Sequence, residues 1–246
     1  MRVEYQPALI ERAVGLLAAR DAEFERRLHR RVDPLYALPP GRERETAFQN
    51  AYAELFVRSG LNGLIDRLLA ERPSIAAGVH RCVVLEAARR TAESVDLFVS
   101  TTEGQQENRR RSLLIQVVAA SLLEPARLEC FLRRELLHVA DMLDPRFEYR
   151  PDRFEGPPAR RDRTRERYRL LWNIYVEGRL RRDGLSDERV VRGLEEGFAR
   201  LFPSATRESV PFDFRTVFAA DVITHPQLLS WASWPEPSVI GAGPGR

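Results

Sequence analysis

The 246-residue sequence predicts a mainly α-helical protein with a small β-sheet, an α+β fold. Apolar residues recur at helical spacing over most of the chain. Two short runs of β-branched and aromatic residues, 95–100 and 112–118, predict strands near its middle. With 43% hydrophobic residues the chain can bury a sizeable core, so we expect a single compact domain over residues 1–236.

The first 72 residues predict an N-terminal helical region. Apolar spacing predicts one helix over residues 9–31, which ends before a proline at position 34. Two more helices are predicted over residues 44–58 and 62–70. A fourth is expected to begin at residue 73 and continue to 94, because a proline at 73 suits the first turn of a helix.

The two predicted strands are joined by a polar, glycine-containing hairpin loop, residues 101–111. Helices are expected to follow at 127–143, 164–183, 187–201, 212–223 and 226–231, with a loop at 146–163 and a glycine closing the second of them. Residues 73–184 thus form the expected central portion and 185–236 the C-terminal helices. Residues 237–246, rich in glycine and proline, are expected to be a disordered tail.

Composition argues against several functions. The 39 basic residues are all arginine and alternate with 36 acidic ones, so the net charge of +3 predicts no basic face for a nucleic acid. No apolar run is long enough to cross a membrane, and we expect a cytoplasmic protein. Cys82 and Cys130 lie among apolar residues at helical spacing, so both are expected to be buried, reduced thiols.

The segment Arg134-Glu135-Leu136-Leu137-His138 has the pattern H-E-x-x-H with its first histidine replaced by arginine. In the intact pattern two histidines one turn apart bind zinc, and the glutamate is the general base for a metal-bound water. A guanidinium has no acceptor atom and stays protonated, so Arg134 cannot be a zinc ligand.

The helix that carries this segment is amphipathic. One stripe is apolar and contains Leu132, Leu136, Val139 and Leu143. The opposite stripe is polar and contains Arg134, Glu135, His138 and Asp141. A solvated polar face is the simplest explanation of such a helix. Because Phe131, Leu137 and Met142 flank the polar stripe, we expect it to line a cleft instead.

Glu177 lies within an apolar stripe of the predicted helix 164–183, together with Ile174 and Leu180. The opposite side carries aromatic residues, so most of this helix is expected to be covered. A buried carboxylate is costly without a cation, a donor or a metal. Arg134 and His138 are the expected partners of Glu177.

The order of a strand pair, a helix with an H-E-x-x-H-like segment and a later helix with an inward glutamate resembles the gluzincin group of zinc metallopeptidases (zincins). The resemblance covers residues 86–183. It implies Glu135 as general base, His138 as a zinc ligand and Glu177 as the third ligand. It also implies a strand edge, here residues 117–121, that holds an extended peptide.

Arg134 leaves two arrangements open. In the first, which we favour, Arg134 pairs with Glu177 in place of zinc, and the protein is an inactive, metal-free relative whose groove binds a peptide or a partner segment. In the second, His138, Asp141 and Glu177 hold zinc or another cation in an active hydrolase.

A carboxylate di-iron site is a weaker alternative. It would add Glu54 and Glu86 to the Glu135-x-x-His138 pair, and it lacks a second Glu-x-x-His. We expect instead that Glu86 pairs with Arg90 on a helix. His225, before a proline, is expected to be a turn or helix-start residue.

Overall fold

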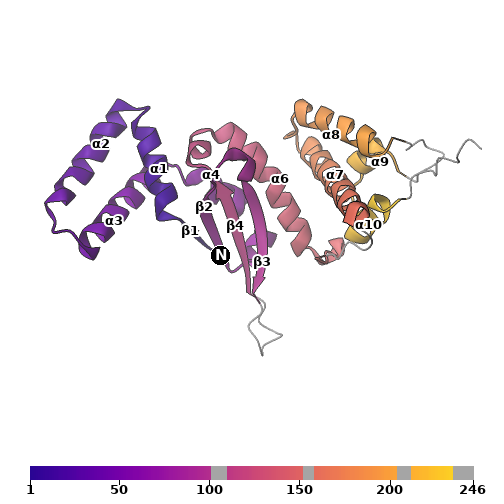
Figure 1. Ribbon diagram of the computed structural model, residues 1–246, viewed down its shortest axis with the longest axis horizontal. Coiled ribbons are helices and arrows are strands. Elements are labelled where there is room, and N and C mark those ends of the chain that lie inside the picture. The colour runs from indigo at the N-terminus through magenta and orange to yellow at the C-terminus, as the bar shows by residue number, and fades with distance from the viewer. Residues whose placement is uncertain (101–109, 152–157, 204–211, 235–246) are drawn as a thin grey trace, which may run out of the picture. The chain divides into compact units, whose positions relative to one another are not determined.

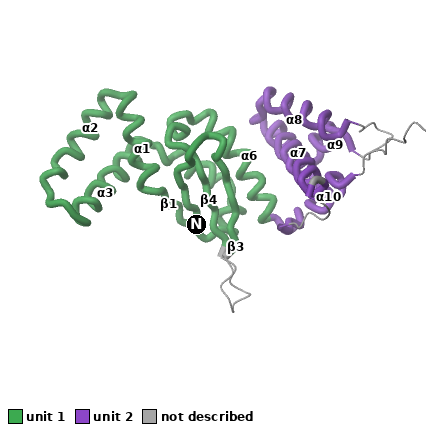
Figure 2. Tube along the Cα trace, in the orientation of Figure 1, with its two compact units in different colours: residues 1–143 green, residues 144–246 purple. Residues whose placement is uncertain are grey.

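The computed structural model describes residues 1–100, 110–151, 158–203 and 212–234. The chain divides into two compact units, Met1–Leu143 (unit 1) and Asp144–Arg246 (unit 2), which Figure 2 colours separately. The prediction of a mainly helical protein with a small sheet is confirmed, since unit 1 contains a four-stranded mixed sheet and helices predominate elsewhere. The expected central portion, 73–184, crosses the boundary between the units.

Unit 1 begins with a strand that the sequence did not predict, β1 (Arg2–Tyr5), followed by the helices α1 (Pro7–Ala18) and α2 (Ala22–Val32). The expectation of one helix over 9–31 is wrong. Asp21 accepts hydrogen bonds from the backbone N–H groups of Glu23 and Phe24, and such a cap starts a new helix.

After the 3-10 helix η1 (Asp33–Ala37), helices α3 (Arg42–Arg58) and α4 (Gly63–Ala70) confirm the two predicted ones. Figure 1 shows α1 between the sheet and the pair formed by α2 and α3.

The predicted helix over 73–94 is also wrong. Helix α5 (Pro73–Gly78) ends early, and the chain continues as strand β2 (Arg81–Glu86) and a 3-10 turn, η2 (Arg90–Ala92). Strand β2 has β1 on one side and β4 (Arg110–Val117) on the other, both parallel to it. Its hydrogen-bond partners therefore lie far away along the chain, and they outweigh the local preference for a helix.

The two strands predicted near the middle are confirmed as β3 (Ser94–Ser100) and β4, which pair antiparallel. Residues 101–109 of the predicted hairpin loop lie outside the described residues. The strand order is β1-β2-β4-β3. Strand β4 is therefore an interior strand, and β3 forms an outer edge of the sheet.

One face of the sheet is the buried face. Cys82, Val84, Leu113 and Ile115 are wholly buried and belong to one core cluster with apolar residues of the surrounding helices. Residues of the opposite face, such as Leu114, are only half-buried. This alternation is the period of two that a sheet with one covered face requires.

The two cysteines differ. Cys82 is buried in the core as predicted, and burial raises the pKa of its thiol to about 12. The same prediction for Cys130 is wrong, because its side chain is exposed. It lies on helix α6 (Pro125–Leu143), on the side away from the core.

In unit 1 the 3-10 helix η3 (Ala119–Leu123) precedes α6. Unit 2 begins after α6 with another 3-10 helix, η4 (Pro145–Phe147). Its helices are α7 (Pro158–Arg182), α8 (Glu188–Leu201), α9 (Phe214–Ala219) and α10 (His225–Ala232). Helix α7 begins earlier than predicted and α9 is shorter. Gly184 has a positive φ of 72° and closes α7, as predicted. The expected tail, 237–246, is not among the described residues.

Candidate functional site

The segment Arg134–His138 lies on α6, as predicted. The apolar stripe of this helix is confirmed: Leu132, Leu136 and Val139 belong to the core of unit 1, and Leu143 packs against it. The helix is therefore fixed to unit 1 through one face. Its polar face points elsewhere, and the surroundings of that face decide what chemistry it can support.

The polar face of α6 is largely buried. The exposed fractions of His138 and Asp141 are 9% and 5%, and Arg134 and Glu135 are half-buried. This polar face is therefore not the solvated surface of an ordinary amphipathic helix, and the predicted cleft stays a prediction. Burial of polar and titratable groups costs free energy unless they find partners, so a polar face of this kind differs from an ordinary amphipathic helix.

Glu135 has a perturbed carboxyl. Burial raises its pKa above the ordinary value of 4.5; the Arg134 guanidinium opposes that shift, and the Asp96 carboxylate on β3 adds to it. A carboxyl with a raised pKa suits proton transfer, which is the role that the resemblance gives to Glu135. Arg134 favours the ionised form, as a nearby zinc ion would in an intact site.

Glu177 lies on α7 and is wholly buried, as predicted. Ile174 and Leu180 of its stripe are buried too, and so are the aromatic residues of the opposite side, Trp172 among them. Ser186 Oγ donates a hydrogen bond to Glu177 Oε1 at 2.8 Å. This donor from the α7–α8 connection was not predicted from the sequence.

His138 and Asp141 belong to unit 1 and Glu177 to unit 2. The pair of Arg134 with Glu177 and the ligand set of His138, Asp141 and Glu177 therefore both stay predictions. Among the described residues, no group of three or more His, Cys, Asp or Glu side chains is arranged to hold a metal ion.

The donors on α6 do not fit the zinc site of the intact motif. That site takes two imidazoles one turn apart, and α6 supplies His138 with a guanidinium in place of the other imidazole. Asp141 adds one carboxylate on the next turn. Two donors and a fixed positive charge do not complete a zinc site, so no chemical step through a metal follows from these residues.

The predicted position of the strand edge that would hold a peptide is wrong. Residues 117–121 end the interior strand β4 and enter η3, and Val117 is already paired with Glu86 of β2. The outer strand on this side is β3. Its residues Phe98 and Val99 have exposed fractions of 54% and 49%, which is high for large apolar side chains. Alternation along residues 95–99 could have indicated that Phe98 lies on the open face.

Two smaller predictions concern Glu86 and His225. Glu86 forms an ion pair with Arg12 at 3.0 Å, not with Arg90, because it lies on a strand. The other expectation is confirmed, since His225 is the first residue of α10. The His225 side chain is buried, and its Nδ1 lies 2.6 Å from the Tyr168 hydroxyl oxygen.

In the part of the chain that the structure describes, no helix has both the length and the apolar character that a membrane span needs.

In comparisons with known proteins, the sequence matches no protein-family model, no curated protein and no solved structure.

Proposed function

We propose that this protein is a degenerate relative of the zinc metallopeptidases, without peptidase activity, and that it binds an extended peptide or a partner segment along β3. The observation that carries the proposal is the effect of Arg134 on Glu135. Burial raises the pKa of Glu135, the carboxyl that would be the general base, and a guanidinium at the former ligand position opposes that rise. The positive charge that zinc would supply there comes from a side chain.

A second feature supports peptide binding. Strand β3 is the last strand in the order of the sheet, so one of its edges has no neighbouring strand in the described sheet. An unpaired edge offers backbone N–H and C=O groups to an extended peptide, and exposed apolar side chains beside it add specificity. Phe98 and Val99 are such side chains. Asp96 of the same strand lies close enough to Glu135 to raise its pKa.

Metal content tests the degenerate site. Purified protein, Arg134→His and Arg134→Gln would be loaded with zinc, dialysed and assayed by elemental analysis. We expect no stoichiometric zinc in the parent or in Arg134→Gln, and a gain of zinc in Arg134→His, because only histidine restores a ligand. Stoichiometric zinc in the parent would contradict the proposal.

Peptide binding is tested separately. A displayed library of random peptides would be selected on the parent protein, and the enriched peptides titrated against Phe98→Asp. The matched control is Val57→Asp, since Val57 is also an exposed apolar residue, with an exposed fraction of 59%, and lies on α3. We expect affinity to fall at least about tenfold in Phe98→Asp only. Failure to enrich any peptide, or equal binding by both variants, would count against the β3 edge.

The alternative is an active metal-dependent hydrolase with His138, Asp141 and Glu177 as ligands. The burial of His138 and Asp141, one turn apart on α6, favours it. It predicts stoichiometric metal in the parent that is lost in His138→Ala and in Glu177→Ala. The degenerate site predicts no metal in any of the three proteins, so one set of measurements separates the two functions.

A further inference from the structure

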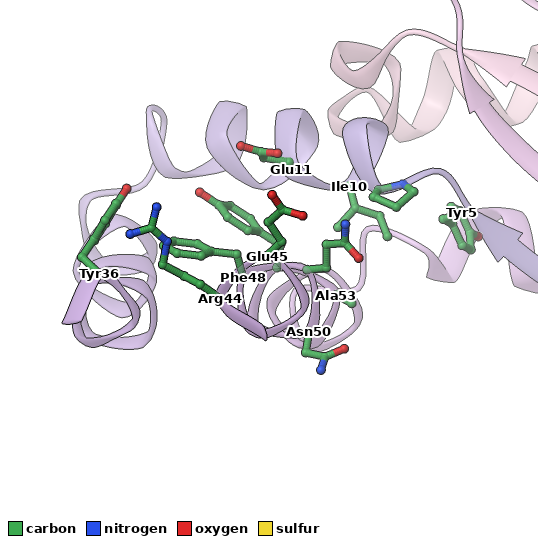
Figure 3. Close-up of a pocket in the computed structure, with 12 residues that line it drawn as sticks. Tyr5, Ile10, Glu11, Tyr36, Arg44, Glu45, Phe48, Asn50 and Ala53 are labelled. Carbon is green, nitrogen blue, oxygen red and sulfur yellow. The ribbon is translucent and has the colours of Figure 1, made fainter. Parts of the chain in front are cut away.

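Unit 1 contains a cavity of about 540 Å³ that is unrelated to the polar face of α6. Figure 3 shows it between α1 and α3, with Tyr36 of η1 at one end. Its volume lies within the range of small-molecule sites. All of its lining residues lie between positions 5 and 53, so the cavity belongs to unit 1 alone.

The cavity follows from the spacing of residues on two helices. Arg44, Phe48 and Tyr52 are four residues apart on α3 and so form one row, with Glu45 beside it. Helix α1 presents Glu11 toward this row (Figure 3). Tyr52 packs against the core of unit 1 and forms part of the cavity floor, which is therefore a fixed surface.

One wall of the cavity is aromatic. The rings of Tyr36 and Phe48 are arranged edge to face, with 5.1 Å between their centroids and 69° between their planes. The exposed fraction of Tyr36 is 67%, an unusual exposure for a large ring beside a cavity. Ring faces attract cations and flat apolar groups, so this pair suits the body of a ligand that carries positive charge.

Two carboxylates supply the complementary charge. Figure 3 shows Glu11 of α1 and Glu45 of α3 lying toward one another across the cavity. Within the described ranges, neither side chain forms a hydrogen bond or an ion pair. The charge of Glu11 also acts on the cavity floor: burial, and after it the Glu11 carboxylate, raises the pKa of Tyr52. Two facing carboxylates repel each other, and a cation between them removes that repulsion.

The cavity also contains one guanidinium, from Arg44. In Figure 3 it lies near Tyr36 and Phe48, away from the space between the two carboxylates. With Glu11 and Glu45 counted against Arg44, the charged lining side chains have a net negative charge. The centre of the cavity is thus the place for a cation, and the aromatic end is the place for an apolar group.

We propose that this cavity binds a small organic amine, with the ammonium group between Glu11 and Glu45 and the apolar or aromatic body against Tyr36 and Phe48. Recognition combines charge-assisted hydrogen bonds to two carboxylates with contact between the body of the amine and the rings. This site is independent of the proposed peptidase-like function and stands if that function fails.

The experiment compares two probes of the same shape. Phenethylamine is a cation at neutral pH, and phenethyl alcohol is its neutral counterpart. Each would be titrated into the protein of 246 residues and followed by calorimetry and by chemical-shift changes. We expect a single site for phenethylamine and binding at least about tenfold weaker for the alcohol.

Variants locate the site. Glu11→Gln and Glu45→Gln should each weaken phenethylamine binding about five- to tenfold, and Phe48→Leu should weaken both probes. The control is Glu43→Gln, since Glu43 is an exposed carboxylate on α3 outside the cavity lining. No binding of phenethylamine, equal binding of the alcohol, or equal losses in Glu43→Gln and Glu11→Gln would each overturn the proposal.

Discussion

Ser186 Oγ donates a hydrogen bond of 2.8 Å to Glu177 Oε1, and the Glu177 side chain is wholly buried within α7. The donor comes from the connection between α7 and α8, nine residues further along the chain. This contact joins a carboxylate in the apolar stripe of α7 to the segment that leads into α8. It gives Glu177 a structural role that is independent of any metal.

Ser186→Ala removes this donor. Because a buried carboxylate then loses one partner, we expect the free energy of unfolding to fall by about 1–3 kcal/mol. Urea denaturation followed by circular dichroism measures it. Ser74→Ala is the control, since Ser74 is exposed at the start of α5. Equal stability of Ser186→Ala and the parent would show that this hydrogen bond does not stabilise unit 2.

Glu93→Ala tests a buried polar network in unit 1. The side chain of Glu93 is 3% exposed and accepts hydrogen bonds from Ser121 Oγ at 2.5 Å, Val118 N at 3.1 Å and Arg127 Nη2 at 2.8 Å. These contacts join the residue before β3 to η3 and the first turns of α6. Removal of the carboxylate takes away the acceptor of these three donors, so we expect the free energy of unfolding to fall by about 2–4 kcal/mol.

The control for Glu93 is Glu54→Ala, because Glu54 forms two ion pairs at the surface, with Arg31 and Arg58. Exposed ion pairs of this kind contribute little to stability, because solvent screens them. The free energy of unfolding, measured by thermal or urea denaturation, should therefore fall more in Glu93→Ala than in Glu54→Ala. A larger loss in Glu54→Ala would refute the assignment of Glu93 to a stabilising network.

Gly178→Ala should disrupt the packing of α7 and α9. A Cβ atom at this position would lie 1.8 Å from the backbone oxygen of Phe218, which no side-chain rotation can relieve. Helix α9 must shift, so we expect a loss of about 3 kcal/mol or more. Gly193→Ala is the matched control in α8. Its Cβ would meet nothing within 4 Å, and we expect a gain of about 0.5–1 kcal/mol in unfolding experiments.

Glu135→Gln should change how stability depends on pH. Burial raises the pKa of Glu135, so the folded protein holds this proton more tightly than the unfolded chain does. The contribution of Glu135 is therefore full below its ordinary pKa and is lost as the pH rises through the raised pKa. Glu135→Gln lacks this loss, and its stability relative to the parent should increase with pH over that window.

Glu54→Gln provides the opposite sign in the same experiment. Hydrogen bonds from Arg31 and Arg58 lower the pKa of Glu54, so its contribution is present above the ordinary pKa and is lost as the pH falls through the lowered one. Unfolding midpoints in urea at a series of pH values measure both variants. Parallel pH profiles for Glu135→Gln and the parent would show that Glu135 is not perturbed.

The two thiols should react at very different rates. Cys130 is exposed, whereas Cys82 is buried and burial raises its pKa to about 12, which leaves almost no thiolate at neutral pH. An aromatic disulfide reagent should modify one thiol in the folded protein and the second only in denaturant. Cys130→Ser should abolish the fast reaction; a fast reaction that persists in this variant would place Cys82 at the surface.

Several features of this protein could be predicted from the amino-acid sequence. The apolar spacing of Leu132, Leu136 and Val139 predicted both the existence of α6 and the face that enters the core. The β-branched runs predicted β3 and β4, and the apolar stripe around Glu177 predicted the burial of that carboxylate. Each of these features depends on side chains a few residues apart, whose spacing directly determines which face of an element is apolar.

The other features depend on contacts between segments that are distant in sequence. Residues 81–86 became β2 because β1 and β4 lie on either side of them, and those strands are distant in sequence. The same strand order placed β3, not the end of β4, at the edge of the sheet. The cavity between α1 and α3 and the hydrogen bond from Ser186 to Glu177 likewise join separate segments. Local periodicity carries no information on such pairings, because the hydrogen bonds and packing that select them form only between distant parts of the chain.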